Sequence, residues 1–192
     1  MDNLGVKFEL RGVKEALNLF SPKVVSKAVR YALDRSGKAI KTDITKEISK
    51  GYNIKQKDIR EKIRIGKAVN IGRDNELKIT IKGSRIPLSK FRLSEQGKGI
   101  VAQIKKGEGT YYERGFYHGT KVTGKRAFQR KGKESYPIWT LYGPSVPQLA
   151  GSEYIYKAVQ RIFRERMQKD FNHGIDYYSG LVKAGGHWVP EE

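Results

Sequence analysis

Apolar residues recur at helical spacing in two long stretches of the chain. The first stretch follows Ser21-Pro22, which favours a helix start, and it ends near Gly51, which favours a helix stop. The second stretch begins after Ser152 and can end at Gly174. The apolar positions are Val25, Val29, Ala32 or Leu33, Ile40, Ile44 and Ile48 in the first, and Ile155, Ala158 or Val159, Ile162 or Phe163, Met167 and Phe171 in the second. Two long amphipathic helices are therefore predicted.

Strand-like patterns lie before and between these helices. Alternation predicts a strand over Leu4–Leu10, a hairpin of 63–71 with 76–82 around Gly72-Arg73-Asp74-Asn75, and a strand over 99–105 whose partner begins near Tyr111. A brief helical turn over Val13–Leu19 and a short helix over Lys55–Lys62 complete the pattern. The fold class expected is α+β, with the long N-terminal and C-terminal helices packed on an antiparallel sheet.

Two further stretches lack clear periodicity. Residues 106–134 are rich in glycine and basic residues and are expected to form a long basic loop excursion from the sheet. Residues 137–149 carry three prolines, which favour an extended, rigid connection. We expect a single domain over 1–175, with the basic loop as an insertion, and a loosely held C-terminal tail over 176–192.

The net charge of +19 is confined to two segments. Residues 22–67 hold fourteen basic and five acidic residues, residues 85–133 hold thirteen and three, and the last 59 residues hold six and seven. Such basic segments favour the binding of a polyanion, either nucleic acid or an acidic protein face. The alternative explanation is that the charged surface only keeps the protein soluble.

Composition narrows the other possibilities. The chain has no cysteine, which excludes disulfides, thiolate zinc sites and cysteine nucleophiles and suits a reducing cytosol. No window approaches eighteen uninterrupted apolar residues, and the N-terminus lacks the pattern of a signal peptide, so neither a membrane span nor export is expected.

Two motifs come close to known binding signatures. Gly119 to Lys125 has the glycine and lysine spacing of a P-loop, but Arg126 stands where a hydroxyl should bind magnesium. Arg114-Gly115-Phe116-Tyr117 begins like an RNA-recognition strand, but Tyr117 and His118 break the pattern. Subunit contacts or ordinary packing explain the aromatics better, and the candidate subunit contacts are Tyr111, Tyr112, Phe116, Tyr117, Tyr142 and Pro144.

Catalytic patterns are weak. His118, His173 and His187 are widely separated, and no Gly-x-Ser-x-Gly elbow nominates a serine nucleophile. We expect no enzyme, no metal and no cofactor. The candidate contacts to DNA or to an acidic partner are the basic residues of the loop, namely Lys121, Lys125, Arg126, Arg130, Lys131 and Lys133.

Three stretches together resemble the prophage minor tail protein Z family of tailed bacteriophages. They are Tyr52 to Ile59, Arg85 to Phe91 and Tyr136 to Leu149, of which Leu141-Tyr-Gly-Pro-Ser-Val-Pro147 is the most specific. The resemblance extends from about residue 22 to residue 175.

The resemblance implies a structural tail-completion or neck protein at the head-proximal end of the tail, made in the bacterial host cytoplasm and built into the virion. By analogy with tail rings it implies a homo-oligomeric ring, with a hexamer as the guess, that meets tail terminator, tail tube or connector proteins and double-stranded DNA in its lumen. The alternative is a stand-alone, sequence-independent nucleic-acid-binding protein.

Overall fold

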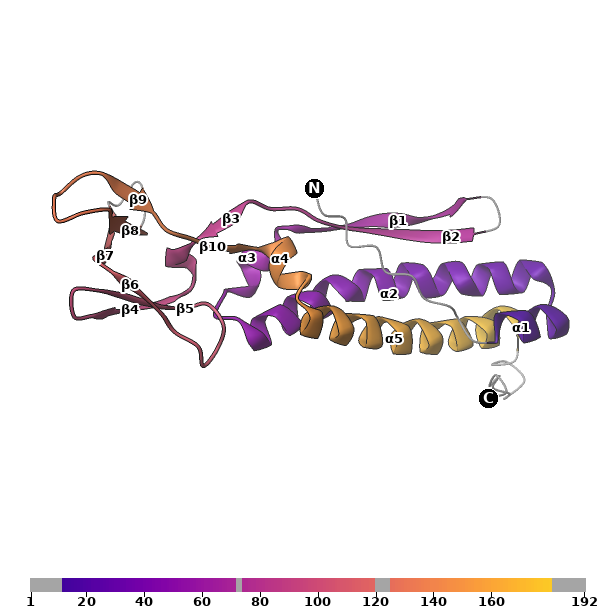
Figure 1. Ribbon diagram of the computed structural model, residues 1–192. Helices are drawn as coiled ribbons and strands as arrows, with labels where there is room; N and C mark the ends of the chain where they lie inside the picture. Colours follow the sequence, from indigo (N-terminus) through magenta and orange to yellow (C-terminus); the bar gives the residue numbers. More distant parts are fainter. Residues whose placement is uncertain (1–11, 72–73, 120–124, 181–192) are drawn as a thin grey trace. The chain divides into compact units, whose positions relative to one another are not determined.

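The computed structural model describes residues 12–71, 74–119 and 125–180, which divide into two compact units. The described residues of the first unit are 45–62, 81–119 and 125–155. Those of the second unit are 12–44, the hairpin residues between 63 and 80, and 156–180. The long helix α2 (Pro22–Gly51) contributes to both units, and each unit is described below by itself (Figure 1).

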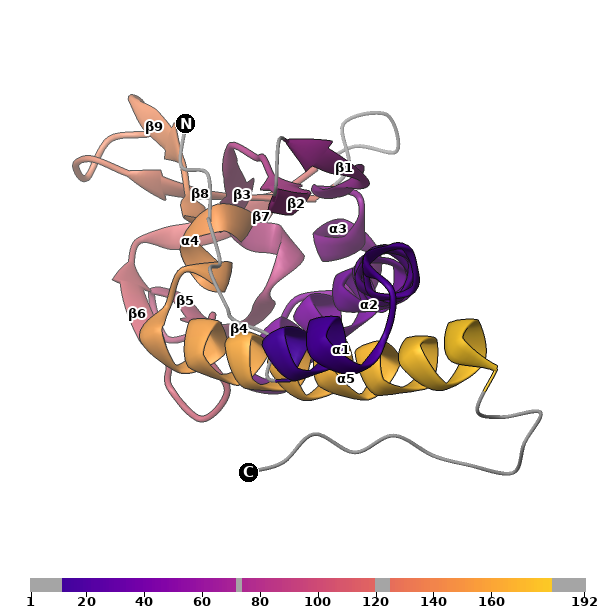
Figure 2. The ribbon, with the colours of Figure 1, turned by 90° about the vertical axis from the view of Figure 1, so that its right-hand side faces the viewer.

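Two antiparallel helices dominate the second unit. Its elements are α1 (Val13–Leu19), most of α2, the hairpin of β1 (Ile63–Ile71) and β2 (Asp74–Ile81), and α5 (Glu153–Ser179). The N-terminal part of α2 lies against the C-terminal part of α5, where a Cβ on Gly174 would come 3.0 Å from the Cα of Ala28 (Figures 1 and 2). Close approach of backbones at this crossing requires glycine.

Polar side chains tie the two helices together beyond that crossing. The buried Ser36 hydroxyl donates to Asp170 Oδ2 at 2.8 Å, and Arg35 forms an ion pair with the same carboxylate. Arg166 of α5 forms an ion pair with Asp43 of α2 at 3.1 Å. A buried polar group that finds its partner on only one neighbouring helix fixes how the two helices align.

Apolar side chains are buried in a stripe along each of the two long helices, including the ends of the helices that belong to the first unit. On α5 the buried side chains recur every fourth residue, and they are Ile155, Val159, Phe163, Met167, Phe171 and Ile175. On α2 they are Val25, Ala28, Ala32, Leu33, Ile40, Ile44 and Ile48. The structure thus buries Val159 and Phe163 at the two positions of α5 where the periodicity left a choice.

The first unit consists of three small antiparallel sheets with short helices. The first sheet pairs β3 (Arg85–Pro87) with β10 (Tyr142–Ser145). The second sheet has the strand order β4 (Arg92–Gln96), β5 (Gly99–Gln103) and β6 (Thr110–Glu113). The third sheet has the strand order β7 (Gly115–His118), β8 (Arg126–Arg130) and β9 (Ile138–Thr140). The helices are α3 (Gln56–Arg60), the 3₁₀ turn Leu88–Lys90 and α4 (Val146–Ala150).

Backbone hydrogen bonds join the end of α2 to the second sheet. The Asn53 amide donates to the Ile104 carbonyl at 2.8 Å, its side-chain amide donates to the Gln103 carbonyl, and the Lys106 amide donates to the Gly51 carbonyl. The turn that leaves α2 is therefore fixed to the turn that follows β5.

The α+β class predicted from the sequence is confirmed, as are the helix starts near Val13 and Pro22, the short helix α3 and the hairpin. The predicted pairing of strand 99–105 with a strand near Tyr111 is also confirmed, since Ile100 lies opposite Tyr112. The predicted strand over Leu4–Leu10 lies outside the described residues. The single domain over 1–175 stays a prediction.

Three local expectations differ from the structure. Within 106–134, where a loop was predicted beyond the strand near Tyr111, the chain also forms β7 and β8, because aromatic residues such as Phe116 and Phe128 pair across neighbouring strands. The proline segment forms β9, β10 and α4, and Ser145 and Gln148 make a capping box at the start of α4.

The third difference is the end of the last helix. Helix α5 passes through Gly174 and ends at Ser179, so the first residues assigned to a loose tail over 176–192 are helical, with Asp176 buried. Gly174 does not end the helix; its missing side chain leaves room for the close approach of α2. Residues 181–192 lie outside the described part.

Candidate nucleic-acid interface

One face of the sheet formed by β7, β8 and β9 combines arginine and phenylalanine side chains. The register places Phe116 opposite Phe128 and Phe128 opposite Thr140, and residues directly opposite each other in antiparallel strands point to the same side. Alternation along each strand adds the remaining members. We call this the arginine–phenylalanine face, and it consists of Phe116, His118, Arg126, Phe128, Arg130, Ile138 and Thr140.

Ring contacts hold the centre of this face together. The rings of Phe116 and Phe128 lie 5.8 Å apart between centroids, and the Arg130 guanidinium lies 5.0 Å from the Phe116 centroid. A guanidinium stacked on an aromatic ring keeps its N–H groups directed outward, where they can donate to an anion. The two phenylalanines are half-buried, whereas Arg126, Arg130 and His118 are exposed.

The opposite face of the same sheet packs inward. Gly115 and Ala127 are buried there, and a Cβ on Gly115 would approach Ile100 Cγ1 of β5 to 2.6 Å. The third sheet therefore rests on the second through this face, which leaves the arginine–phenylalanine face outward.

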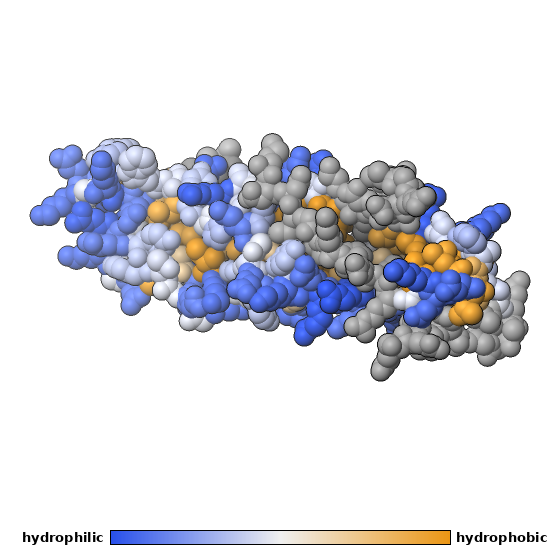
Figure 3. All heavy atoms as spheres, turned by 45° about the vertical axis from the view of Figure 1, so that its right-hand side comes forward, coloured by the Kyte–Doolittle hydropathy of each residue, from blue (hydrophilic) through white to orange (hydrophobic). Residues whose placement is uncertain are grey.

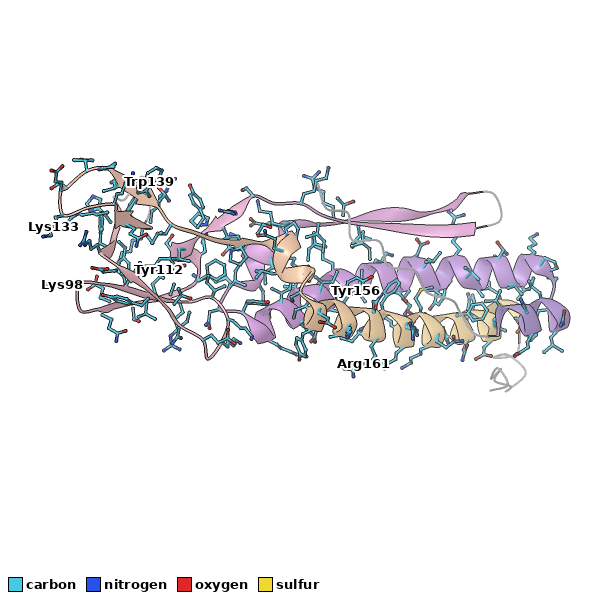
Figure 4. The ribbon with its side chains drawn as sticks, in the orientation of Figure 1. Lys98, Tyr112, Lys133, Trp139, Tyr156 and Arg161 are labelled. Atoms are coloured by element: carbon cyan, nitrogen blue, oxygen red, sulfur yellow. The ribbon has the colours of Figure 1, made fainter. Side chains whose placement is uncertain are left out.

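The basic residues nominated from the sequence surround the outward face. Lys125 is exposed immediately before β8, and Lys131 and Lys133 are exposed in the turn between β8 and β9. Figure 4 labels Lys133 in this turn. In Figure 3 the end of the first unit that carries β6 to β9 is coloured blue to pale blue. The structure thus brings five of the six nominated cations to one sheet, whereas Lys121 lies outside the described residues.

Three other basic residues of the first unit, unlike these cations, have an acidic partner among the described residues. Lys90 is paired with Asp58, Lys105 with Glu108 and Arg114 with Glu113. The hydrogen bond to Glu108, followed by charge attraction from the same carboxylate, raises the pKa of Lys105. Within the described residues, no ion pair involves any of Lys125, Arg126, Arg130, Lys131 and Lys133.

The aromatic residues nominated as subunit contacts divide between sheets. Tyr111 and Tyr112 are in β6, and Phe116 and Tyr117 are in β7. Between them stands Arg114, whose φ of 56° turns the chain from the second sheet into the third. Tyr142, which is 48% exposed, and the half-buried Pro144 are in β10. No single aromatic cluster forms from this set.

Other chemistry finds little support among the described residues. His118 is in β7 and His173 is in α5 beside Tyr31, whereas His187 lies outside the described part. In that part no three histidine or acidic side chains gather as a metal site would require. The same residues include no helix long and apolar enough to span a membrane. The P-loop-like spacing from Gly119 to Lys125 falls mostly outside the described residues.

Sequence reasoning missed a group of exposed apolar residues around β9. Tyr136, Ile138 and Trp139 are 74%, 38% and 58% exposed, and they lie at and just before β9. A signal was present, because residues 135–152 contain no charged residue and no histidine in a chain that is 31% charged.

The fold is that of an α+β protein, and the third sheet gives it an outward surface of basic and aromatic side chains. The chain belongs to the prophage minor tail protein Z family, whose model matches residues 10–183. It is therefore a structural protein of the phage tail and a component of the virion, where it meets other tail or virion proteins. No curated protein and no solved structure matches the chain.

Proposed function

We propose that this chain is a tail-completion or neck subunit, located at the head-proximal end of the tail. Copies of it assemble as a ring that helps join tail to head, and DNA passes through the ring. The subunit acts by binding, without catalysis. The observation that carries the proposal is the arginine–phenylalanine face, whose cations have no acidic partner within the described residues.

Arg126 and Arg130, which form no ion pair within the described residues, suit contact with the phosphates of DNA. Arg126 and Arg130 are four residues apart on β8 and point to the same side, which places them about 13 Å apart along the strand. Such contacts neutralise phosphates irrespective of base sequence, as a protein through which any DNA sequence passes requires. The stacking of Arg130 on Phe116 supports the same role, since it reduces the freedom the guanidinium would lose on binding.

Binding to DNA is tested by the salt dependence of affinity. Replacing Arg126 and Arg130 with glutamine removes two phosphate contacts. The plot of log affinity against log salt has a negative slope, and each lost contact should make that slope shallower by about 0.9. The matched control replaces Lys55 and Lys57 with glutamine, because these exposed lysines of the same unit lie outside the face and the charge change is identical. Fluorescence anisotropy with duplex DNA between about 50 and 200 mM salt measures both slopes.

Equal slopes for the two double variants would refute DNA contact by this face. If both variants bind DNA as wild type does but the Arg126/Arg130 variant no longer binds purified tails, the partner is an acidic protein face. If DNA binding follows the prediction and the protein is missing from virions, the alternative of a stand-alone nucleic-acid-binding protein is favoured.

Position and assembly are tested on virions. Cryo-electron microscopy of phage particles with and without this chain should show a ring of density at the head-proximal end of the tail that disappears on deletion, with heads and tails left unjoined. Density elsewhere on the tail, or normal particles made without the chain, would refute the neck assignment.

A further inference from the structure

The longest uncharged stretch of the chain forms an exposed strand edge. Residues 135–152 span eighteen positions without a charged side chain or a histidine, and they include β9, β10 and α4. Four of their large apolar side chains are exposed, namely Tyr136 at 74%, Ile138 at 38%, Trp139 at 58% and Tyr142 at 48%. Figure 4 labels Trp139 at β9, with Lys133 in the turn that precedes it.

Strand β9 is the terminal strand of its sheet. The order is β7, β8, β9, and within the described residues no strand pairs with β9 on its outer side. The Lys131 amide donates to the Pro137 carbonyl and the Leu141 amide to the Ala127 carbonyl. Antiparallel alternation therefore directs the backbone groups of Ile138 and Thr140 away from β8, toward the open edge.

This edge lacks the charged residues that the edge strands β4 and β6 of the same unit carry. Proteins commonly place charged residues, especially lysine, on edge strands to prevent pairing with another chain. The edge strand β4 carries Arg92 and Glu95, and the edge strand β6 carries Glu113. Neither edge strand of the third sheet, β7 or β9, carries a lysine, an arginine or a carboxylate. The large apolar side chains of β7 are half-buried, whereas Ile138 and Trp139 of β9 are exposed, and this exposure distinguishes the β9 edge.

From these observations we infer that the β9–β10 edge, with Tyr136, Ile138, Trp139 and Tyr142, is a contact surface for a second copy of this chain. This inference rests on the proposed function, because a ring of identical subunits needs a contact between copies, and it names the surface that makes this contact. Each copy carries a net charge of +19, so two copies repel each other wherever their basic surfaces meet. The uncharged stretch adds no charge of its own at a contact between copies, and it offers DNA or an acidic protein no cation of its own. The cation beside it, Arg130 opposite Ile138, belongs to β8 and not to the open edge of β9.

The exposed area sets the strength of the contact. At about 200 Å² for a whole aromatic side chain, the three exposed aromatics and Ile138 offer roughly 400 Å² per copy, or about 800 Å² for two copies. Stable interfaces bury at least about 1,200 Å² in total, so two free copies associate weakly. The open backbone edge and the additional contacts of a closed ring strengthen the association in the assembled tail.

The salt dependence of self-association distinguishes this contact from an ionic one. Salt screens the repulsion between copies and leaves apolar contacts intact, so association should strengthen as salt rises from about 50 to about 500 mM. Binding to DNA changes in the opposite direction. Sedimentation equilibrium of the purified full chain up to a concentration near 500 μM should show concentration-dependent association that increases with salt.

Matched variants then locate the surface. The double change Ile138→Lys with Trp139→Lys places two charges on the edge, and it should lower the association constant at least tenfold. The control is Tyr154→Lys with Tyr177→Lys, which adds the same charge at aromatics that are 69% and 64% exposed elsewhere, and it should associate nearly as wild type does. Trp139→Ser adds no charge, and it tests the surface if circular dichroism shows that the lysine variant is unfolded.

Wild-type protein that stays monomeric under all these conditions would overturn the inference, as would association that weakens with salt. Equal association by the edge variant and the Tyr154/Tyr177 control would also overturn it. These outcomes leave the neck assignment to be decided by the position of the protein in virions. Conversely, a protein found elsewhere on the tail refutes the neck assignment and leaves the edge contact standing.

Discussion

Gly174 allows α2 and α5 to approach closely, and adding a methyl group there tests the packing of the second unit. A Cβ at this position would come 3.0 Å from the Cα of Ala28, 3.1 Å from its Cβ and 3.2 Å from its carbonyl oxygen. Two of these atoms belong to the backbone of a thirty-residue helix, so relief requires the helices to move apart.

Two opposing effects decide the magnitude of the Gly174→Ala change. Alanine in a helix interior is favoured over glycine by about 0.5–1 kcal/mol. Overpacking of a tight contact costs about 1–3 kcal/mol, and here the contacting atoms cannot rotate away. We therefore expect a net loss of about 1 kcal/mol in the free energy of unfolding for Gly174→Ala, and a loss of about 3 kcal/mol for Gly174→Val.

Urea unfolding followed by circular dichroism measures both changes. Gly51→Ala is the matched control, because the nearest atom to a Cβ at this helical glycine is Ile155 Cδ1 at 4.0 Å, an ordinary contact. That control should unfold at or slightly above the wild-type denaturant concentration. A Gly174→Ala protein as stable as wild type, together with a tolerated Gly174→Val, would refute the close crossing of the two helices.

Three further changes test other parts of the structure. Asp170→Ala leaves the buried Ser36 hydroxyl without its acceptor, and it should cost about 1–3 kcal/mol in urea unfolding, whereas Asp34→Ala on the exposed side of α2 should cost little. Gly143→Ala would place a Cβ 2.6 Å from the Phe91 ring, so its melting temperature should fall and should partly recover when Phe91→Leu is added; no recovery would contradict this packing. Ser145→Ala removes the capping box of α4 and should lower the free energy of unfolding by about 1 kcal/mol, and an unchanged value would argue against the cap.

The helices were predictable because their signals are local. The capping pattern at Ser21-Pro22 and the spacing from Val25 to Ile48 lie within one element, and the structure begins α2 at Pro22 and ends it at Gly51. The short strands β7 to β10 were missed because each has only three to five residues, too few for alternation to be recognised. Gly174 was assigned to a helix end because a glycine in sequence does not reveal a neighbouring helix.

The candidate site was predictable only as a list of residues. Arg126, Arg130 and their basic neighbours could be named from charge and position, but their arrangement required the register of β7, β8 and β9. The register aligns Phe116 with Phe128, stacks Arg130 on Phe116, and separates both from Tyr111 and Tyr112 in another sheet.

By itself the sequence determined the two amphipathic helices, the hairpin, the two basic segments and the resemblance to a tail protein family, since all of these reside in neighbouring residues or in composition. Only the tertiary structure decided which cations share a face, which glycine admits a neighbouring helix, and which uncharged strand ends a sheet. These features depend on pairings between residues far apart in the chain, such as Ser36 with Asp170 and Phe128 with Thr140. Local periodicity specifies which side of an element is buried, but it does not specify the element that covers that side.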